Sequence, residues 1–287
     1  MKEFEQALQR ARSLVNAPAP EPSAPPADGP PTIKGVTGRP FMAEPKPEFT
    51  ANPAREATSL PLLDADMDQF RASFGADNQG GRNIDGAFRL LRTQILASMK
   101  DRQGQVLGIT SAGPGAGKSF TAIHLAMACA RRSEQHAVLA DFDFRRPSIA
   151  SYLAAVDFPS SLGYFRGDGP LDQFLTRNEG GNLRYLLTDR SSELSAEYLA
   201  SSKMDAALTE LTARSKDTLV IADLPPLMGC DDTLAIMPKL DGLVIVVAAG
   251  ESSFGDVEQA VAQVPPEKVV ATVLNKVDGT SSTYDYY

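Results

Sequence analysis

The chain has 287 residues, which allows one or two domains, and its hydrophobic content of 43% is enough for a sizeable core. A formal net charge of −8 argues against a nucleic-acid-binding protein, which usually carries a basic surface. The two cysteines, Cys129 and Cys230, have neither disulfide nor zinc-site spacing. The charged N-terminus is unlike a signal peptide and no run of ~18 apolar residues occurs, so we expect a cytoplasmic protein without a membrane span.

Residues 1–80 differ in composition from the rest of the chain. More than half of the 21 prolines lie between Pro18 and Pro53. Because proline lacks a backbone N–H and restricts the residue before it, this stretch predicts an extended, disordered tether. A PxxP ligand for a partner domain is the alternative reading. Ahead of the prolines, residues 2–15 have apolar side chains at helical spacing, which predicts a short amphipathic helix. We therefore assign residues 1–80 to this helix and the disordered, proline-rich tether.

From about residue 81, helical and strand patterns alternate. We expect strands over 106–110, 137–140, 219–222, 243–249 and 269–274. Helices are expected over 84–99, 203–216 and 256–264, and a further helix follows the Gly-rich turn after the first strand and ends at 132. The last four strands are continuous apolar runs, typical of strands buried on both faces. The pattern predicts an α/β fold with a doubly wound, mostly parallel sheet flanked by helices. We assign this domain to residues 81–278 and a flexible, tyrosine-rich tail to 279–287.

A glycine-rich segment, Ala-Gly-Pro-Gly-Ala-Gly-Lys-Ser over residues 112–119, connects the first strand to the next helix. Its glycines allow unusual dihedrals, so that backbone amides can converge on phosphate oxygens at a helix N-terminus. Lys118 would supply charge to the β- and γ-phosphates of a nucleotide, and the Ser119 hydroxyl would bind Mg²⁺. A Gly-rich turn without a ligand is the alternative. The nucleotide-binding residues predicted in this segment are Gly113, Gly115, Ala116, Gly117, Lys118, Ser119 and Phe120.

Acidic residues follow two of the predicted strands. Asp141 and Asp143 are separated by one residue, so both should point to the same side at the carboxyl end of the sheet. Two acids beside a polyphosphate repel it unless a cation lies between them, which implies Mg²⁺. Asp223 ends a later strand and fits a water-mediated magnesium role. Solvated acids in strand-end turns are the alternative, and Arg145 and Arg146 either clamp phosphate or belong to a solvated turn.

Together the three motifs resemble those of the bacterial tyrosine kinases that control capsule and exopolysaccharide export. That family has a Walker A motif, an apolar-Asp-x-Asp-x-Arg motif and a Walker B motif reading Asp-x-Pro-Pro. The corresponding segments here are 112–119, 141–145 and 223–226. As in that family, the chain ends in a tyrosine cluster, formed by Tyr284, Tyr286 and Tyr287. The resemblance spans about residues 81–287.

The resemblance implies an ATP-dependent protein-tyrosine autokinase that requires Mg²⁺. Lys118 and the loop amides would balance phosphate charge, with Ser119, Asp143 and Asp223 around the metal. Asp141 is our choice for accepting the tyrosine proton, although Asp141 and Asp143 could exchange these roles. The tyrosine cluster would be phosphorylated between neighbouring subunits and reset by a cognate phosphatase. The resemblance also implies a membrane-embedded activator of the polysaccharide co-polymerase type, which would recruit the protein to the inner face of the membrane.

One departure from the family concerns assembly. The family has Glu-x-x-Arg-x-x-Arg on the helix before the phosphate loop, which it uses for subunit contacts. Here both arginines, Arg89 and Arg92, are present, but Gly86 replaces the glutamate. Asp85 is adjacent to this position but about 100° away around a helix. We therefore expect a monomer or a weak homo-oligomer.

Three other functions remain open from the sequence. A partitioning or positioning ATPase shares this type of fold but has a second lysine, at the position of Gly113 here. A catalytically weak regulatory partner of an export complex would keep the same motifs. Residues 275–278 read Asn-Lys-Val-Asp, as in the guanine-reading motif of GTPases. The kinase family also often has an asparagine after this strand, so we assign Asn275 to nucleotide binding and favour ATP.

Overall fold

The computed structural model describes residues 60–65, 80–131 and 135–277. Internal contacts divide the chain into Met1–Arg55 and Glu56–Tyr287, and all described residues belong to the second unit. The predicted helix over 2–15, the proline-rich tether and the tyrosine cluster lie outside the described residues.

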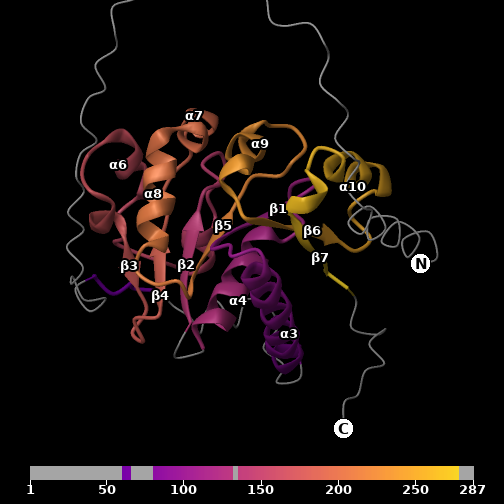
Figure 1. Cartoon of the computed structure of the whole chain (residues 1–287), viewed down its shortest axis with the longest axis horizontal. Helices are drawn as coiled ribbons and strands as arrows, with labels where there is room; N and C mark the ends of the chain where they lie inside the picture. Colours follow the sequence, from indigo (N-terminus) through magenta and orange to yellow (C-terminus); the bar gives the residue numbers. More distant parts are fainter. Residues whose placement is uncertain (1–59, 66–79, 132–134, 278–287) are drawn as a thin grey trace, which may run out of the picture. The chain divides into compact units, whose positions relative to one another are not determined.

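Strands from the whole length of this unit form one seven-stranded sheet in the order β3-β4-β2-β5-β1-β6-β7 (Figure 1). They are β1 (Val106–Ser111), β2 (His136–Asp141), β3 (Thr176–Arg177), β4 (Leu183–Leu186), β5 (Thr218–Asp223), β6 (Gly242–Ala248) and β7 (Val269–Asn275). Every neighbouring pair is parallel except β3 and β4. Since parallel neighbours need crossover connections, the helices between them cover both faces. The predicted doubly wound α/β fold is confirmed.

The helices form a layer on each side of the sheet. The α-helices in the described residues are α3 (Gly80–Asp101), α4 (Lys118–Ala130), α5 (Ile149–Tyr152), α6 (Ser161–Arg166), α7 (Ser195–Ala200), α8 (Ser202–Thr212), α9 (Asp232–Ile236) and α10 (Phe254–Val261). Short 3-10 helices are η2 (Leu171–Phe174), η3 (Met237–Lys239) and η4 (Pro266–Lys268). Figure 1 shows α3 and α4 below the sheet and α6 to α9 above it. No helix in this part of the chain has both the length and the apolarity needed to cross a membrane.

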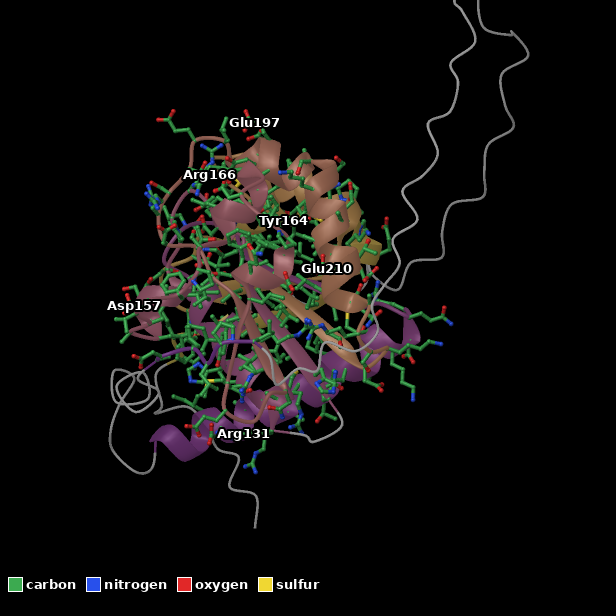
Figure 2. The ribbon with its side chains drawn as sticks, turned by 90° about the vertical axis from the view of Figure 1, so that its left-hand side faces the viewer. Arg131, Asp157, Tyr164, Arg166, Glu197 and Glu210 are labelled. Carbon is green, nitrogen blue, oxygen red and sulfur yellow. The ribbon has the colours of Figure 1, made fainter. Side chains whose placement is uncertain are left out.

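The contact between α3 and α4 combines aromatic packing with a surface ion pair. Phe88 of α3 stacks on His124 of α4, with ring centroids 4.9 Å apart. Arg131, which is labelled in Figure 2, lies directly after α4. Its side chain pairs with Asp85 of α3 at 3.1 Å. Both side chains of this pair are about half exposed. Asp85 therefore has a partner within its own chain.

The central strands are buried on both faces. Successive residues of a strand point to opposite sides of the sheet. Leu107 and Ile109 of β1 belong to the core that includes α3 and α4. Between them, Gly108 faces the other layer, where a Cβ would collide with Leu224 and Leu240. Every residue of β1, β5 and β6 is buried, and so is β2 from Ala137 onward. The prediction of strands buried on both faces is confirmed for β2, β5 and β6.

The prediction that the last strand is buried on both faces is wrong. Among the described residues, β7 pairs with β6 alone and lies at the edge of the sheet, where Thr272 and Leu274 are exposed. Two residues apart, they share one face of the strand. The opposite face of β7 packs on the core through Ala271 and Val273, which explains the apolar residues of this strand.

At the other edge, a segment remote in sequence pairs with β3. The backbone of Leu63 donates a hydrogen bond to Arg177, and Arg177 donates one to Pro61, at 2.9 and 3.0 Å. Leu60 is buried, and Leu63 and Ala65 pack against the core. Residues 60–65, which the sequence places in the N-terminal region before the domain, thus pair with the edge strand of the sheet.

Candidate functional site

The glycine-rich loop joins β1 to α4 at the carboxyl edge of the sheet. Gly115 and Gly117 have φ values of 79° and 92°, a left-handed conformation that favours glycine. Gly113 is not among the residues with positive φ, and a Cβ there would meet no atom within 4 Å. The conformational requirement for glycine therefore applies to Gly115 and Gly117.

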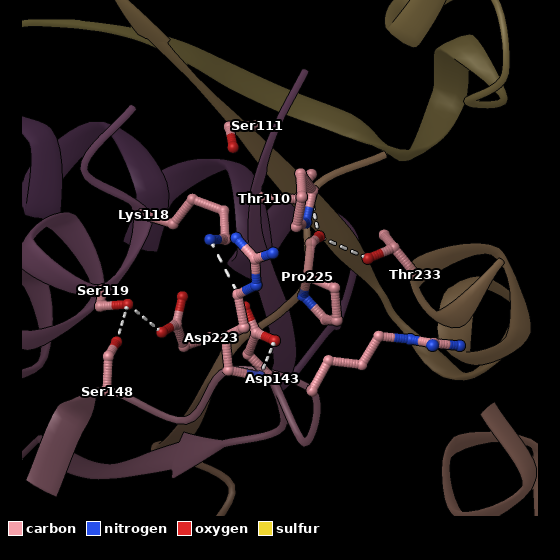
Figure 3. Close-up of polar contacts among 12 residues, drawn as sticks. Thr110, Ser111, Lys118, Ser119, Asp143, Ser148, Asp223, Pro225 and Thr233 are labelled. Atoms are coloured by element: carbon pink, nitrogen blue, oxygen red, sulfur yellow. Dashed lines mark hydrogen bonds and ion pairs between the residues drawn. The ribbon is translucent and has the colours of Figure 1, made fainter. Parts of the chain in front are cut away.

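Lysine, serine and acidic side chains converge beside this loop, and we refer to Lys118, Ser119, Asp141, Asp143 and Asp223 as the strand-end cluster. Lys118 Nζ lies 3.6 Å from Asp143 Oδ2, and these side chains are only 10% and 7% exposed (Figure 3). The Ser119 hydroxyl donates to Asp223 Oδ2 and lies 2.7 Å from the Ser148 hydroxyl. The structure thus brings all the predicted catalytic and metal-binding residues into one site.

The register of two neighbouring strands explains how two of the acids meet. Asp141 at the end of β2 is paired with Asp223 at the end of β5. Asp141 Oδ2 accepts hydrogen bonds from the amides of Ser148 and Ile149, at 3.0 and 3.1 Å. The remaining oxygens, Asp141 Oδ1 and Asp223 Oδ1, are buried and have no hydrogen-bond partner among the described residues. Two buried acceptor oxygens without donors are a feature that a bound cation would satisfy.

Burial makes the ionised form of these acids costly. It raises the pKa of Asp223 to about 6, against the opposing effects of Lys118 and the Ser119 hydroxyl. Burial and then the negative charge of Asp223 raise the pKa of Asp141 well above its usual value. Burial also raises the pKa of Asp143, with Lys118 opposing the rise. Ionising all three acids would place excess negative charge in a poorly solvated site, so a positive ion bound there would favour their ionised forms.

A pocket of about 420 Å³ opens beside the cluster. Its lining includes Gly115, Gly117, Lys118, Ser119 and Asp143, together with Arg145, Arg146, Ser148 and Tyr152 from the chain after β2 and Pro225, Pro226, Met228, Gly229 and Cys230 from the segment after β5. Asp141 and Asp223 are completely buried and are not among the lining residues. Asp143 is therefore the acid of the cluster that a molecule in the pocket can reach.

The two arginines after β2 differ in their contacts. Arg145 binds Asp232 through both Nε and Nη2, at distances of 2.7 to 2.9 Å. Its guanidinium is therefore occupied by a carboxylate, an arrangement that neither sequence alternative included. Arg146 donates its backbone N–H to Asp143, and its exposed side chain lines the pocket.

The remaining predicted nucleotide-binding residues contact the protein itself. Asn275 at the end of β7 donates to the Ala116 carbonyl at 2.9 Å, which links the last strand to the phosphate loop. Gly117 directly follows this carbonyl, and a Cβ there would collide with the Asn275 amide. Phe120 packs on His124, with centroids 4.1 Å apart, on the α3 side of α4. Neither Asn275 nor Phe120 is among the lining residues of the pocket.

Comparison with known proteins shows which proteins this chain resembles in sequence. No family model matches the chain. The tyrosine-protein kinase YwqD of Bacillus subtilis is 27% identical over 203 residues, which cover 70% of this chain and 84% of YwqD. The tyrosine-protein kinase CpsD of Streptococcus agalactiae is 26% identical over 203 residues, 70% of this chain and 86% of CpsD. Over about 70% of its length, the chain is thus similar in sequence to bacterial tyrosine-protein kinases.

Two further comparisons show the extent of this kinase relationship. EpsB of Ralstonia solanacearum is 29% identical over 203 residues, which cover 70% of this chain but only 26% of EpsB. The chain therefore spans about a quarter of the length of that relative. The kinase domain of the Escherichia coli tyrosine kinase ETK has the same fold, with a TM-score of 0.63 and 23% identity over 71% of this chain and 79% of that one.

Sequence reasoning missed several residues that shape the kinase-like site. Asp232 binds Arg145, and the hydroxyls of Thr110 and Thr233 both donate to the Pro225 carbonyl at 2.7 Å. Ser148 contacts Ser119. Asp231 and Asp232 follow Pro225 and Pro226 closely in the sequence. Because acidic residues often begin a helix, they indicated the start of α9. The other contacts have no sequence signature.

Proposed function

We propose that the protein is an ATP-dependent protein-tyrosine autokinase that regulates exopolysaccharide or capsule synthesis and export. The observation that carries the proposal is the strand-end cluster, in which Lys118 and Ser119 lie beside Asp143 and Asp223 at the phosphate loop. Relationship to tyrosine-protein kinases selects phosphoryl transfer to tyrosine among the reactions that such a site can support. The export role rests on the resemblance of the three motifs.

Lys118 and the backbone amides at the start of α4 would hold the phosphates of ATP. The loop conformation at Gly115 and Gly117 leaves these amides at a helix N-terminus, which favours anions. Because Lys118 is already paired with Asp143, the lysine would shift between this carboxylate and the nucleotide. This position gives it the compact positive charge that phosphoryl transfer requires.

The residues present also fit Mg²⁺. Ser119 and Asp223 are the residues that would hold the ion, and Asp223 has a buried oxygen without a donor. Among the described residues, no group of three His, Cys, Asp or Glu is placed to bind a metal ion alone. Magnesium commonly uses one or two protein carboxylates and completes its shell with water and phosphate oxygens. When bound, it would neutralise phosphate charge during transfer.

Asp141 and Asp143 remain the two candidates for accepting the tyrosine proton. Asp143 lines the pocket, whereas Asp141 is completely buried and bound to two amides. Since a general base must come within hydrogen-bond reach of the proton it removes, this favours Asp143. The tyrosine oxygen would then attack the γ-phosphorus, ADP would leave, and the proton would pass to the carboxylate.

We further propose that Tyr284, Tyr286 and Tyr287 are the acceptors, phosphorylated by a neighbouring subunit. Three of the seven tyrosines of the chain lie in its last four residues. Each phosphate adds nearly two negative charges, so repeated phosphorylation beside Asp285 should repel the tail from an acidic, nucleotide-loaded site. A phosphatase would be needed to restart the cycle.

Recruitment and activation form the last part of this proposal. The protein would act in the cytoplasm, at the inner face of the membrane, with a membrane-embedded activator of the polysaccharide co-polymerase type. The proposal rests on the family resemblance, and it predicts low phosphotyrosine formation by the isolated chain. Adding candidate cytoplasmic peptides of such activators should raise it.

The test is to incubate the full chain with Mg-ATP, with and without activator peptides, and locate phosphotyrosine by mass spectrometry. We expect label on the C-terminal tyrosines and its loss when all three are changed to phenylalanine. Tyr164→Phe, at a tyrosine that does not line the pocket, serves as the matched control. Undiminished labelling of the triple variant would refute the acceptor assignment. ATP hydrolysis without phosphotyrosine under every condition would show a plain ATPase.

A further inference from the structure

Two chain segments that are far apart in sequence both contribute to the pocket lining. One follows β2 and contributes Asp143, Arg145 and Arg146, and the other follows β5 and contributes Pro225, Pro226, Met228, Gly229 and Cys230. The contact between Arg145 and Asp232 joins them.

Arg145 and Asp232 form an ion pair in which two guanidinium nitrogens donate hydrogen bonds to one carboxylate. Arg145 Nε lies 2.9 Å from each Asp232 oxygen, and Nη2 lies 2.7 Å from Oδ1. The Asp232 side chain is 0% exposed, although Arg145 is 45% exposed. A buried carboxylate without a partner is strongly disfavoured, so Asp232 keeps the guanidinium in place.

The backbone on the Arg145 side is firmly held. Phe144, the residue before it, is completely buried and packs edge-on against Phe165 and Tyr198, with centroids 5.1 and 5.9 Å away. The Phe144 carbonyl accepts a hydrogen bond from the amide of Ser192 at 2.7 Å. Tyr198 belongs to α7, which packs against α9, the helix that begins with Asp232.

The segment after β5 is held at both of its ends. Thr233 in α9 and Thr110 in β1 donate to the Pro225 carbonyl, both at 2.7 Å. The amides of Leu227 and Met228 donate to the backbone of β1 and of the phosphate loop, at 2.8 and 3.0 Å. Gly229 follows with a φ of 92°, where the chain turns back toward Asp232. The ion pair therefore joins two well-supported segments.

We propose that Arg145 and Asp232 act as a latch that fixes the segment 225–232 as one side of the pocket. Both are positioning residues, because they set where the pocket side lies without contacting the reacting atoms. The latch deepens the proposed function, since the pocket it shapes is the one assigned to ATP. Arg145 is then unavailable for phosphate, and Arg146 is the arginine of this pair that can contact an anion.

The test measures amide hydrogen exchange of the full chain without nucleotide, in Arg145→Gln, Arg145→Lys, Asp232→Asn and the Arg145→Gln/Asp232→Asn double variant. In Arg145→Gln, exchange within 225–232 should accelerate about tenfold, while β5 and β6 stay protected. Arg145→Lys should be intermediate, because lysine keeps the charge but lacks the fork. The double variant should show less than the sum of the single effects, because it leaves no buried charge unpaired.

The matched control is Arg166→Gln, which removes an exposed pair with Asp168 and does not line the pocket (Figure 2). Unchanged exchange in 225–232, or equal acceleration throughout β5 and β6, would overturn the latch. Binding of a fluorescent ATP analogue should weaken about tenfold in Arg145→Gln but not in Arg166→Gln. If the unaltered protein binds no nucleotide while the exchange pattern holds, the latch stands and the proposed function fails.

Discussion

The strand-end cluster and the outer contact between α3 and α4 both pair acids with basic side chains, but in opposite surroundings. Lys118 and Asp143 are 10% and 7% exposed, whereas Arg131 and Asp85 are 41% and 50% exposed. Water screens the second pair, so it contributes little to stability. In the cluster, three carboxylates share limited positive charge, and burial raises their pKa values.

This difference separates a site shaped for binding from a contact that supports the fold. Burying Asp141 and Asp223 with unpaired oxygens opposes folding, and a ligand that supplies positive charge would compensate for it. Substitutions of Asp141 and Asp223 should therefore impair activity while sparing or raising stability. Substitutions at the α3–α4 contact should change stability slightly and leave nucleotide binding intact.

The largest effect is expected from Lys118→Ala. Without this charge, phosphotyrosine formation should fall by about three orders of magnitude, and the affinity for Mg-ATP should weaken. Calorimetry and phosphotyrosine detection measure the two effects. Lys216→Ala, at an exposed lysine that does not line the pocket, is the control. Wild-type affinity and activity in Lys118→Ala would remove the phosphate-loop assignment.

The next effect distinguishes Asp143 from Asp141. If Asp143 accepts the proton, Asp143→Asn should lower kcat by roughly 100-fold or more with little change in Mg-ATP affinity. Asp141→Asn would then act mainly through its amide contacts and its neighbour Asp223, which changes nucleotide affinity more than kcat. Steady-state kinetics with a tyrosine-containing acceptor peptide test the assignment. The reverse pattern would give the proton-accepting role to Asp141.

Substitution of Asp223 is expected to raise the free energy of unfolding rather than lower it. Its pKa of about 6 in the folded chain exceeds the ordinary 3.8, so between these values the folded state binds more protons than the unfolded state. The contribution of protonated Asp223 to the free energy of unfolding is therefore fully present below pH ~4 and is lost as pH rises through ~6. Asp223→Asn should stabilise the nucleotide-free protein by about 2 kcal/mol at pH 7 and flatten this part of its pH dependence. Denaturant unfolding at several pH values measures it, and destabilisation at pH 7 would contradict the charge argument.

The smallest effects belong to α3. Asp85→Asn, which weakens an exposed pair, should cost about 0.5 kcal/mol or less. Gly86→Ala should stabilise the helix by about 0.5 to 1 kcal/mol, and a Cβ there has room, with Arg89 Nη2 as its nearest neighbour at 4.0 Å.

Light scattering at micromolar concentration should show a monomer or weak oligomer for the unaltered protein. A stable ring would show that other contacts replace the missing glutamate.

Much of the fold and most of the candidate site could be predicted, because their signals are local. A buried strand followed by glycines, Lys118 and Ser119 specifies a turn into a helix, and this order places both side chains at the same edge. Asp141 and Asp223 end apolar strands, so a parallel sheet necessarily brings them to that edge. The same logic failed for β7, since an apolar run does not reveal whether a strand has one neighbour or two.

The sequence by itself determined the alternation of helices and strands, the phosphate loop and the placing of acids at strand ends, since each depends on residues adjacent along the chain. Tertiary structure alone decided that Asp143 rather than Asp141 lines the pocket, that Asp232 binds Arg145, and that residues 60–65 pair with β3. These outcomes depend on strand register and on packing between segments tens of residues apart. Such contacts follow from which surfaces are buried together, and no spacing within a single motif encodes them.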